Sequence, residues 1–234
     1  MARLLRKPSA RIGVDDLLNH SPWFTALSEP ARAQVRATIL ERVLAAGELL
    51  GHDGERQHHW FGVAEGLLKW SINAPDGRTV TLGGQSVGSW FGEGTLLRDQ
   101  PRRSDLVALR PSRVALLPFD TFDALRRSEP SFNEFLLAQL NERLHWFMGN
   151  FAAHRLLDAD RLVGRALLGL VHPLLNPLGE NHLQISQEEL ANLATVSRQK
   201  CNQSLLGLAR EGILSLEYGA IHVLDRASLQ ARSG

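Results

Sequence analysis

A polar, basic segment between residues 195 and 210 carries side chains suited to contact with nucleic acid. It holds three basic residues and no acidic residue. Arginine can bind guanine O6 and N7 with two hydrogen bonds, and glutamine and asparagine can bind adenine in the same way. The candidate DNA-contacting side chains are Ser197, Arg198, Gln199, Lys200, Asn202 and Gln203. Together they predict a helix face that lies in the major groove of double-stranded DNA.

The residues around this segment predict two helices joined by a tight turn. Ser186 stands three residues before Glu189, the capping-box spacing that starts a helix near Gln187. Ser197 is the N-cap candidate of a second helix, which we expect to end near Gly212. The pair predicts a helix-turn-helix.

The turn and the segment after it add detail. Thr195 lies in the turn, where a β-branched residue is tolerated if its φ stays negative. Cys201 should pack beneath the turn as a small apolar residue. Residues 213–216 and 220–223 flank Tyr218 and Gly219, which predicts a hairpin that serves as a wing along the phosphates. The alternative is a helical hairpin with an ordinary solvated polar face.

The rest of the 234-residue chain divides into a β part and a long helix. Glycines separate short apolar runs from Gly47 to Phe119, a pattern that predicts a small all-β barrel or roll. Within it, a turn at residues 75–78 predicts a hairpin. After Pro130, apolar residues recur every three or four positions, as in a two-stranded coiled coil. These seam residues are Leu137, Leu140, Leu144, Phe147 and Phe151. The alternative is a helix packed only on its own domain.

The N-terminal region is less patterned. Residues 1–20 read as a tail, with a basic cluster from Arg3 to Arg11 that we interpret as solvated. Residues 28–43 predict one short amphipathic helix, because Ala31, Val35, Ile39 and Val43 lie four residues apart.

Composition excludes several classes of protein. The single cysteine, Cys201, rules out an internal disulfide framework and an iron–sulfur cluster. The apolar runs are too short for a membrane helix, and the N-terminus lacks a secretory signal, so we expect a cytoplasmic protein without a membrane partner.

A cupin-like metal enzyme is a distant alternative, because the nine histidines are scattered and His58 and His59 would point to opposite faces of a strand. We therefore predict that the protein is not an enzyme.

The order of these parts resembles the family of the bacterial cyclic-AMP receptor protein and fumarate-nitrate regulator. The residues that carry the resemblance are Gly47-Glu48-x-Leu50, Gly54-Glu55, Gly66, Gly92-Glu93, Arg103-Ser104 and Ser197-Arg198-Gln199. The family implies an α+β fold: an N-terminal β-roll sensor domain over 21–129, a dimerisation helix over 130–158, and a C-terminal winged helix-turn-helix over 159–234. It also implies a homodimer on a palindromic operator and contact with RNA polymerase.

The resemblance further implies an effector site in the roll. By analogy, backbone amides near Gly92 approach a cyclic phosphate, Glu93 accepts from a ribose hydroxyl, Arg103 neutralises the phosphate and Ser104 donates to it. In the alternative, Arg103 pairs with Glu93 and braces an empty roll. Asp105 would place a negative charge near the phosphate.

Two further departures concern the base and the operator. Phe147 and Met148 replace the hydroxyl pair that reads adenine in the family, so Trp146 and Phe147 either stack on a purine or fill the dimer seam. Gln199 and Gln203 stand where a glutamate and an arginine are usual, which predicts a different operator. The effector stays open: a cyclic nucleotide, a cyclic dinucleotide, another metabolite, a redox signal, or none.

Overall fold

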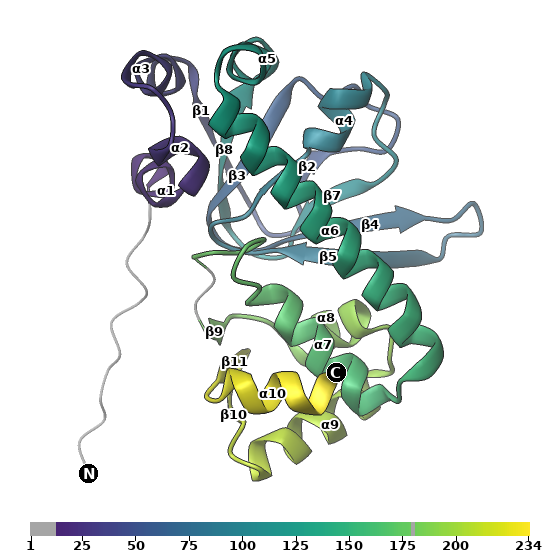
Figure 1. The fold of residues 1–234 in the computed structure, drawn as a ribbon. Helices are drawn as coiled ribbons and strands as arrows, with labels where there is room; N and C mark the ends of the chain where they lie inside the picture. The colour runs from purple at the N-terminus through teal and green to yellow at the C-terminus, as the bar shows by residue number, and fades with distance from the viewer. Residues whose placement is uncertain (1–12, 179–180) are drawn as a thin grey trace.

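The computed structural model describes residues 13–178 and 181–234. Its upper half is a roll of two four-stranded antiparallel sheets (Figure 1). The first sheet has the order β1 (Leu40–Leu44), β8 (Ser112–Pro118), β3 (His59–Glu65) and β6 (Trp90–Phe91). The second has the order β2 (Leu49–Gly51), β7 (Asp105–Ala108), β4 (Leu68–Asn73) and β5 (Thr79–Gln85). Buried side chains of both sheets form one cluster, so the predicted roll is confirmed.

The β4–β5 hairpin projects from the roll (Figure 1). The Ala74 N–H donates to the Arg78 carbonyl oxygen over 2.7 Å, and Gly77 has a φ of +85°. The turn predicted at residues 75–78 is therefore confirmed, and glycine supplies the left-handed conformation that it needs.

Short helices flank the roll: α1 (Val14–His20), α2 (Pro22–Thr25), α3 (Glu29–Thr38), α4 (Glu93–Arg98) and α5 (Phe119–Ser128). The prediction of a tail over residues 1–20 is wrong for residues 14–20, because Leu17 and Leu18 are fully buried in a core cluster. The predicted helix over 28–43 is too long. Ile39 is extended and ends α3, and Val43 lies in β1 with 63% of its surface exposed. Arg3 to Arg11 lie outside the described residues.

The long helix α6 (Pro130–Leu156) has 27 residues and crosses the molecule diagonally (Figure 1). One face, including Phe132, Leu136 and Arg143, is buried against the same chain. The neighbouring face carries the α6 seam, in which Leu140 is half-buried and the other four residues are exposed: Leu137, Leu144, Phe147 and Phe151. The helix thus presents an apolar stripe that its own domain does not cover.

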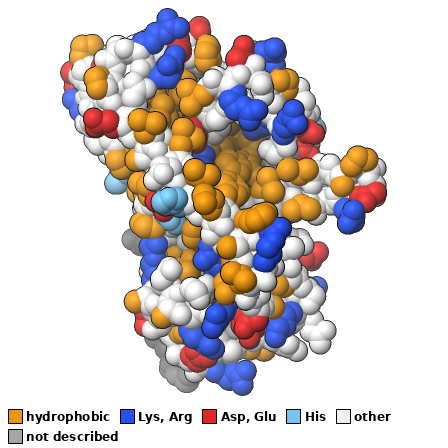
Figure 2. Space-filling model, turned by 45° about the vertical axis from the view of Figure 1, so that its right-hand side comes forward, with side chains coloured by type: hydrophobic (Ala, Val, Ile, Leu, Met, Phe, Trp, Pro, Cys, Tyr) orange, Lys and Arg blue, Asp and Glu red, His pale blue; other side chains and the backbone are white. Residues whose placement is uncertain are grey.

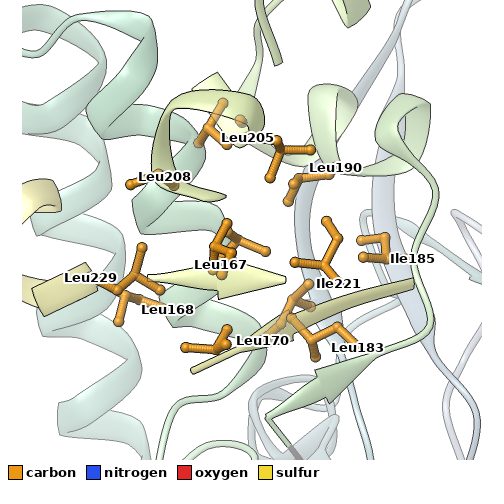
Figure 3. Packing of buried hydrophobic residues seen from close by; sticks show 14 of the residues in the cluster. Leu167, Leu168, Leu170, Leu183, Ile185, Leu190, Leu205, Leu208, Ile221 and Leu229 are labelled. Atoms are coloured by element: carbon orange, nitrogen blue, oxygen red, sulfur yellow. The ribbon is translucent and has the colours of Figure 1, made fainter. Parts of the chain in front are cut away.

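The C-terminal part contains α7 (Ala159–Leu170), β9 (His182–Leu183), α8 (Gln187–Ala194), α9 (Arg198–Arg210), β10 (Leu214–Glu217), β11 (Ala220–Val223) and α10 (Arg226–Ser233). Leucine and isoleucine side chains from these helices and strands point toward one another and form its core (Figure 3). The helix α10 was not expected from the sequence. It buries Leu229 against α7, where Gly164 leaves space for the close approach.

The roll and the C-terminal part are in direct contact. The Ser86 hydroxyl donates to the Leu170 carbonyl oxygen over 2.9 Å, and the Ser86 N–H donates to Asn176 Oδ1 over 3.0 Å. A Cβ atom on Gly84 would lie 2.5 Å from Leu170 Cδ2, so only glycine permits this approach of β5 to α7. No helix within the described ranges is both long and apolar enough to span a bilayer.

Candidate DNA-binding face and effector pocket

The helix-turn-helix forms as its capping residues predict. The Ser186 hydroxyl accepts from the Glu189 N–H over 3.2 Å, and Glu189 Oε2 accepts from the Ser186 N–H over 2.8 Å. Ser197 caps α9 by accepting from the Lys200 N–H over 3.2 Å. The β10–β11 hairpin follows, with Tyr218 fully exposed at its tip. The predicted helices, turn and wing hairpin are therefore all confirmed.

The turn between α8 and α9 has one unusual backbone torsion angle. Thr195 has a φ of +57° and a ψ of +41°, the left-handed conformation, so the condition under which a β-branched residue is tolerated there is not met. A β-branched residue is strained there. Thr195 is held because its N–H and that of Val196 both donate to carbonyl oxygens at the end of α8.

The predicted DNA-contacting residues form one surface at the start of α9, which we call the recognition face. Five of its members are exposed, namely Ser197, Arg198, Gln199, Lys200 and Gln203. Asn202 is half-buried, and its Oδ1 accepts from Gln187 Nε2 over 3.4 Å, so it is less available than the others. Cys201 lies on the opposite side, where burial raises the pKa of its thiol to about 11, and it packs in the core as predicted.

Asp160 also belongs to this region, although sequence analysis did not identify it. Its Oδ1 lies 3.7 Å from Lys200 Nζ and accepts a hydrogen bond from the Ser204 hydroxyl. Asp160 therefore anchors α9 to α7 and restrains Lys200. Asp160 and Lys200 are 40 positions apart, so no local pattern reveals the contact.

A pocket of about 460 Å³ opens between α4, the β4–β5 hairpin and α6. It brings together five of the six residues that the resemblance assigns to the effector: Gly92, Glu93, Arg103, Ser104 and Phe147. We call it the roll pocket. Figure 2 shows a hollow beside the projecting hairpin, with hydrophobic side chains on its floor and Lys or Arg side chains near its rim.

Gly92 and Glu93 are positioned by buried polar contacts. Gly92 has a φ of +98°, and its carbonyl oxygen accepts from Gln57 Nε2 over 3.0 Å. Glu93 is only 1% exposed, and its Oε1 accepts from Arg143 Nη1 over 2.7 Å while its Oε2 accepts from Trp60 Nε1 over 3.2 Å. The alternative pairing of Glu93 with Arg103 is therefore wrong, because Arg143 of α6 occupies that carboxylate.

Arg103 is exposed at the pocket, and the described residues provide no hydrogen bond or ion pair for its guanidinium. Asp105 does not line the pocket. Its carboxylate accepts from the Asp53 N–H over 2.8 Å and from Asn73 Nδ2 over 2.6 Å. The expectation that Asp105 opposes an anion beside Arg103 is wrong, because these hydrogen bonds hold its carboxylate at Asp53 and Asn73, outside the pocket lining.

The two aromatic candidates on α6 separate. The rings of Phe147 and Trp70 are stacked at 6° with centroids 6.4 Å apart, and both line the roll pocket. Trp146 lies outside this pocket. It packs against the C-terminal core, 5.4 Å from the His172 ring and 5.3 Å from the Arg165 guanidinium carbon.

Sequence analysis missed Arg143, Trp70 and Arg102 in the pocket wall. Arg143 Nη2 also donates to the Trp90 carbonyl oxygen over 2.5 Å, so this side chain ties α6 to the roll. In the part of the chain with described coordinates, no group of three or more His, Cys, Asp or Glu side chains is arranged to hold a metal ion.

Comparison with known proteins agrees with this geometry. Residues 41–129 match the model of the cyclic nucleotide-binding domain, and residues 153–232 match that of the Crp-like helix-turn-helix domain. The chain belongs to the family of the cyclic-AMP receptor protein and fumarate-nitrate regulator. As a member of this family, it is a DNA-binding transcriptional regulator.

Relatives of the regulator match it over nearly their whole length. It is 25% identical to the CRP-like cAMP-activated global transcriptional regulator of Mycobacterium tuberculosis, covering 94% of this chain and 100% of that relative. It is 29% identical to the cyclic AMP receptor protein of Thermus thermophilus, covering 90% of this chain and 95% of the relative. The structure of FixK2 from Bradyrhizobium japonicum shares the fold, with a TM-score of 0.70 at 16% identity over 84% of this chain and 98% of that one.

Proposed function

We propose that this regulator is a cytoplasmic homodimer joined along α6, and that an anionic effector in the roll pocket switches its binding to operator DNA. The observation that carries the proposal is that Leu140, Leu144 and Phe147 belong both to the pocket wall and to the α6 seam. A ligand that contacts these side chains touches the helix face where a second subunit would pack. Ligand and dimer geometry are therefore coupled directly.

In this proposal the roll over 21–129 senses the effector, and residues 130–158 join the subunits. Arg103 binds the anionic group, because it lines the pocket and no residue in the described ranges takes a hydrogen bond from its guanidinium. Gly92 and Ser104 contribute backbone and hydroxyl contacts. Glu93 holds Arg143 in place, and a carboxylate oxygen with a spare lone pair can still accept from a ligand hydroxyl.

In this proposal the winged helix-turn-helix over 159–234 binds the operator DNA. Arg198, Gln199 and Gln203 read base edges, whereas Ser197 and Lys200 contact phosphates near the N-terminus of α9. Asn202 contributes from the edge of this face. The bound dimer acts on transcription through contact with RNA polymerase. The cAMP-activated relatives support a nucleotide-type effector.

The test is DNA affinity measured with and without anionic nucleotides, using the wild-type chain and Arg103→Ala. We expect at least one nucleotide to change the affinity of the wild type, and Arg103→Ala to lose that response with unchanged thermal stability. The control is Arg32→Gln, which removes a positive charge on α3, outside the pocket lining. A wild type whose DNA affinity ignores every nucleotide, or an Arg103→Ala variant that responds normally, would contradict the proposal.

A further inference from the structure

The roll pocket has an excess of positive charge. Four arginines and one acidic residue line it: Arg98, Arg102, Arg103, Arg143 and Glu93. Glu93 and Arg143 form an ion pair, which cancels one charge of each sign. Three guanidinium groups remain without an acidic side chain in the lining. Arg98 Nη2 donates to the neutral Gln100 side chain over 2.6 Å, and Arg98 forms no ion pair with any residue that the structure describes.

Arg102 is the most unusual of the three. Arg102 is only 7% exposed, and its Nε is a buried donor for which the described residues provide no acceptor. The guanidinium carbon lies 6.0 Å from the centre of the Phe61 ring and against Gly51, where a Cβ atom would be 1.9 Å from Nη1. Burial lowers the pKa of Arg102, and the nearby carboxylates of Glu55 and Asp105 partly offset that effect. A buried cation with an unsatisfied donor is unfavourable unless something binds it.

The part of the wall that α6 and the β4–β5 hairpin form is apolar apart from Arg143. Trp70 and Phe147 present stacked rings, and Leu82 and Leu144 continue the surface. None of these four side chains offers a hydroxyl that could read a base edge. A volume of about 460 Å³ falls within the range of about 300–1,000 Å³ typical of small-ligand sites. The pocket thus combines a flat apolar wall with several cations.

We propose that the effector is a nucleotide-sized molecule carrying at least two negative charges, one bound by Arg103 and another by the buried Arg102. This inference rests on the proposed function, because it concerns the charge of the ligand in the same pocket. A cyclic mononucleotide has one phosphodiester charge, which Arg103 alone can neutralise. A phosphomonoester carries about −1.5 to −2 near pH 7, and it can satisfy both guanidinium groups.

The test compares ligands that share a base and differ in charge. Binding to the full-length protein is measured by titration calorimetry for cyclic AMP against 5′-AMP, cyclic GMP against 5′-GMP, and cyclic di-GMP, each at two salt concentrations. We expect at least one ligand with two charges to bind ten-fold or more tightly than the cyclic mononucleotide of the same base. Its affinity should also fall more steeply with salt, because more charge is neutralised.

Variants assign the second charge to Arg102. Arg102→Gln should weaken the doubly charged ligand about ten-fold and leave cyclic mononucleotide affinity unchanged, whereas Arg103→Ala should weaken both classes. Arg32→Gln is the matched control for loss of one positive charge. The salt dependence of the wild type gives a reading that does not depend on whether Arg102→Gln folds.

The outcomes distinguish failure of this inference from failure of the proposed function. A cyclic mononucleotide that binds as tightly as every doubly charged ligand, and that changes DNA affinity, overturns the inference and leaves the proposed function intact. Equal weakening of both ligand classes by Arg102→Gln also overturns it. If no ligand in the set binds or alters DNA affinity, both the inference and the effector-switched function fail.

Discussion

Arg110 Nη2 donates to Glu189 Oε2 over 3.1 Å and thereby links the roll to the first helix of the helix-turn-helix. The two side chains are 17% and 23% exposed, so water screens the pair less than an open surface pair. The same Glu189 oxygen caps α8 by accepting from the Ser186 N–H. One carboxylate therefore starts α8 and also fixes that helix to the sensor domain.

Arg110→Gln should loosen this contact while leaving the cap of α8 in place. Loss of the charged hydrogen bond should cost about 1–2 kcal/mol of local stability. Amide hydrogen exchange at residues 186–190 should accelerate about ten-fold. The effector-dependent change in DNA affinity should shrink, because the roll and α8 are less firmly joined. Arg78→Gln, which breaks an exposed pair with Asp76 on the β4–β5 hairpin, is the control, and equal exchange in both variants would refute the linkage.

Thr195→Gly should stabilise the C-terminal domain. Thr195 has a φ of +57°, a conformation that costs a residue with a Cβ atom about 1–2 kcal/mol and glycine almost nothing. After subtraction of the extra flexibility of glycine in the unfolded chain, we expect a gain of up to about 1 kcal/mol in the free energy of unfolding. Denaturant titration measures it. Thr79→Gly in strand β5 should instead lower stability, and a loss in both variants would mean that Thr195 is not strained.

Leu137→Arg should convert the proposed α6 dimer to a monomer without unfolding the chain. Leu137 is 68% exposed in the single chain, so the change removes little intramolecular packing. In a paired α6 seam it would place charges in an apolar interface, where they are costly. Sedimentation velocity measures the outcome. Ala138→Arg, one position round the helix and also exposed, should remain dimeric. A dimeric Leu137→Arg protein would exclude this seam as the interface.

The sequence predicts elements whose signals are local. The capping box at Ser186 and Glu189 places α8 to within a residue, and the 3,4 spacing of apolar residues predicts α6. Contacts between distant segments leave no such signal. The Glu93–Arg143 pair joins residues 50 positions apart. Arg102 is buried by contacts with Gly51 of β2 and Phe61 of β3, which are far from it in the sequence.

Local patterns also misled in two places. The four-residue spacing that continues through Val43 is accidental, because the chain becomes extended at Ile39. Residues 14–20 are too short to show a clear helical period, yet Leu17 and Leu18 are adjacent on α1 and both are fully buried. Hydrophobic spacing alone does not show which short helices find a surface to pack on.

Arg198→Ala should remove base discrimination. Arg198 is exposed at the start of α9, and a two-bond contact with guanine discriminates by about 1–3 kcal/mol. Affinity for the specific operator should fall by that amount, and affinity for random DNA should change little. Lys200→Gln, the comparison variant, should weaken both kinds of DNA similarly. Loss of affinity for all DNA in Arg198→Ala would assign the arginine to phosphate contact.

The most direct test of the account is selection of duplexes from a random library by the purified full-length protein, with the effector present. A homodimer with two recognition faces should recover an inverted repeat whose half-site centres lie about 10 base pairs apart, or about 34 Å. Recovery of a single unrepeated motif, or of no enriched sequence, would contradict the claim that paired α9 helices read DNA.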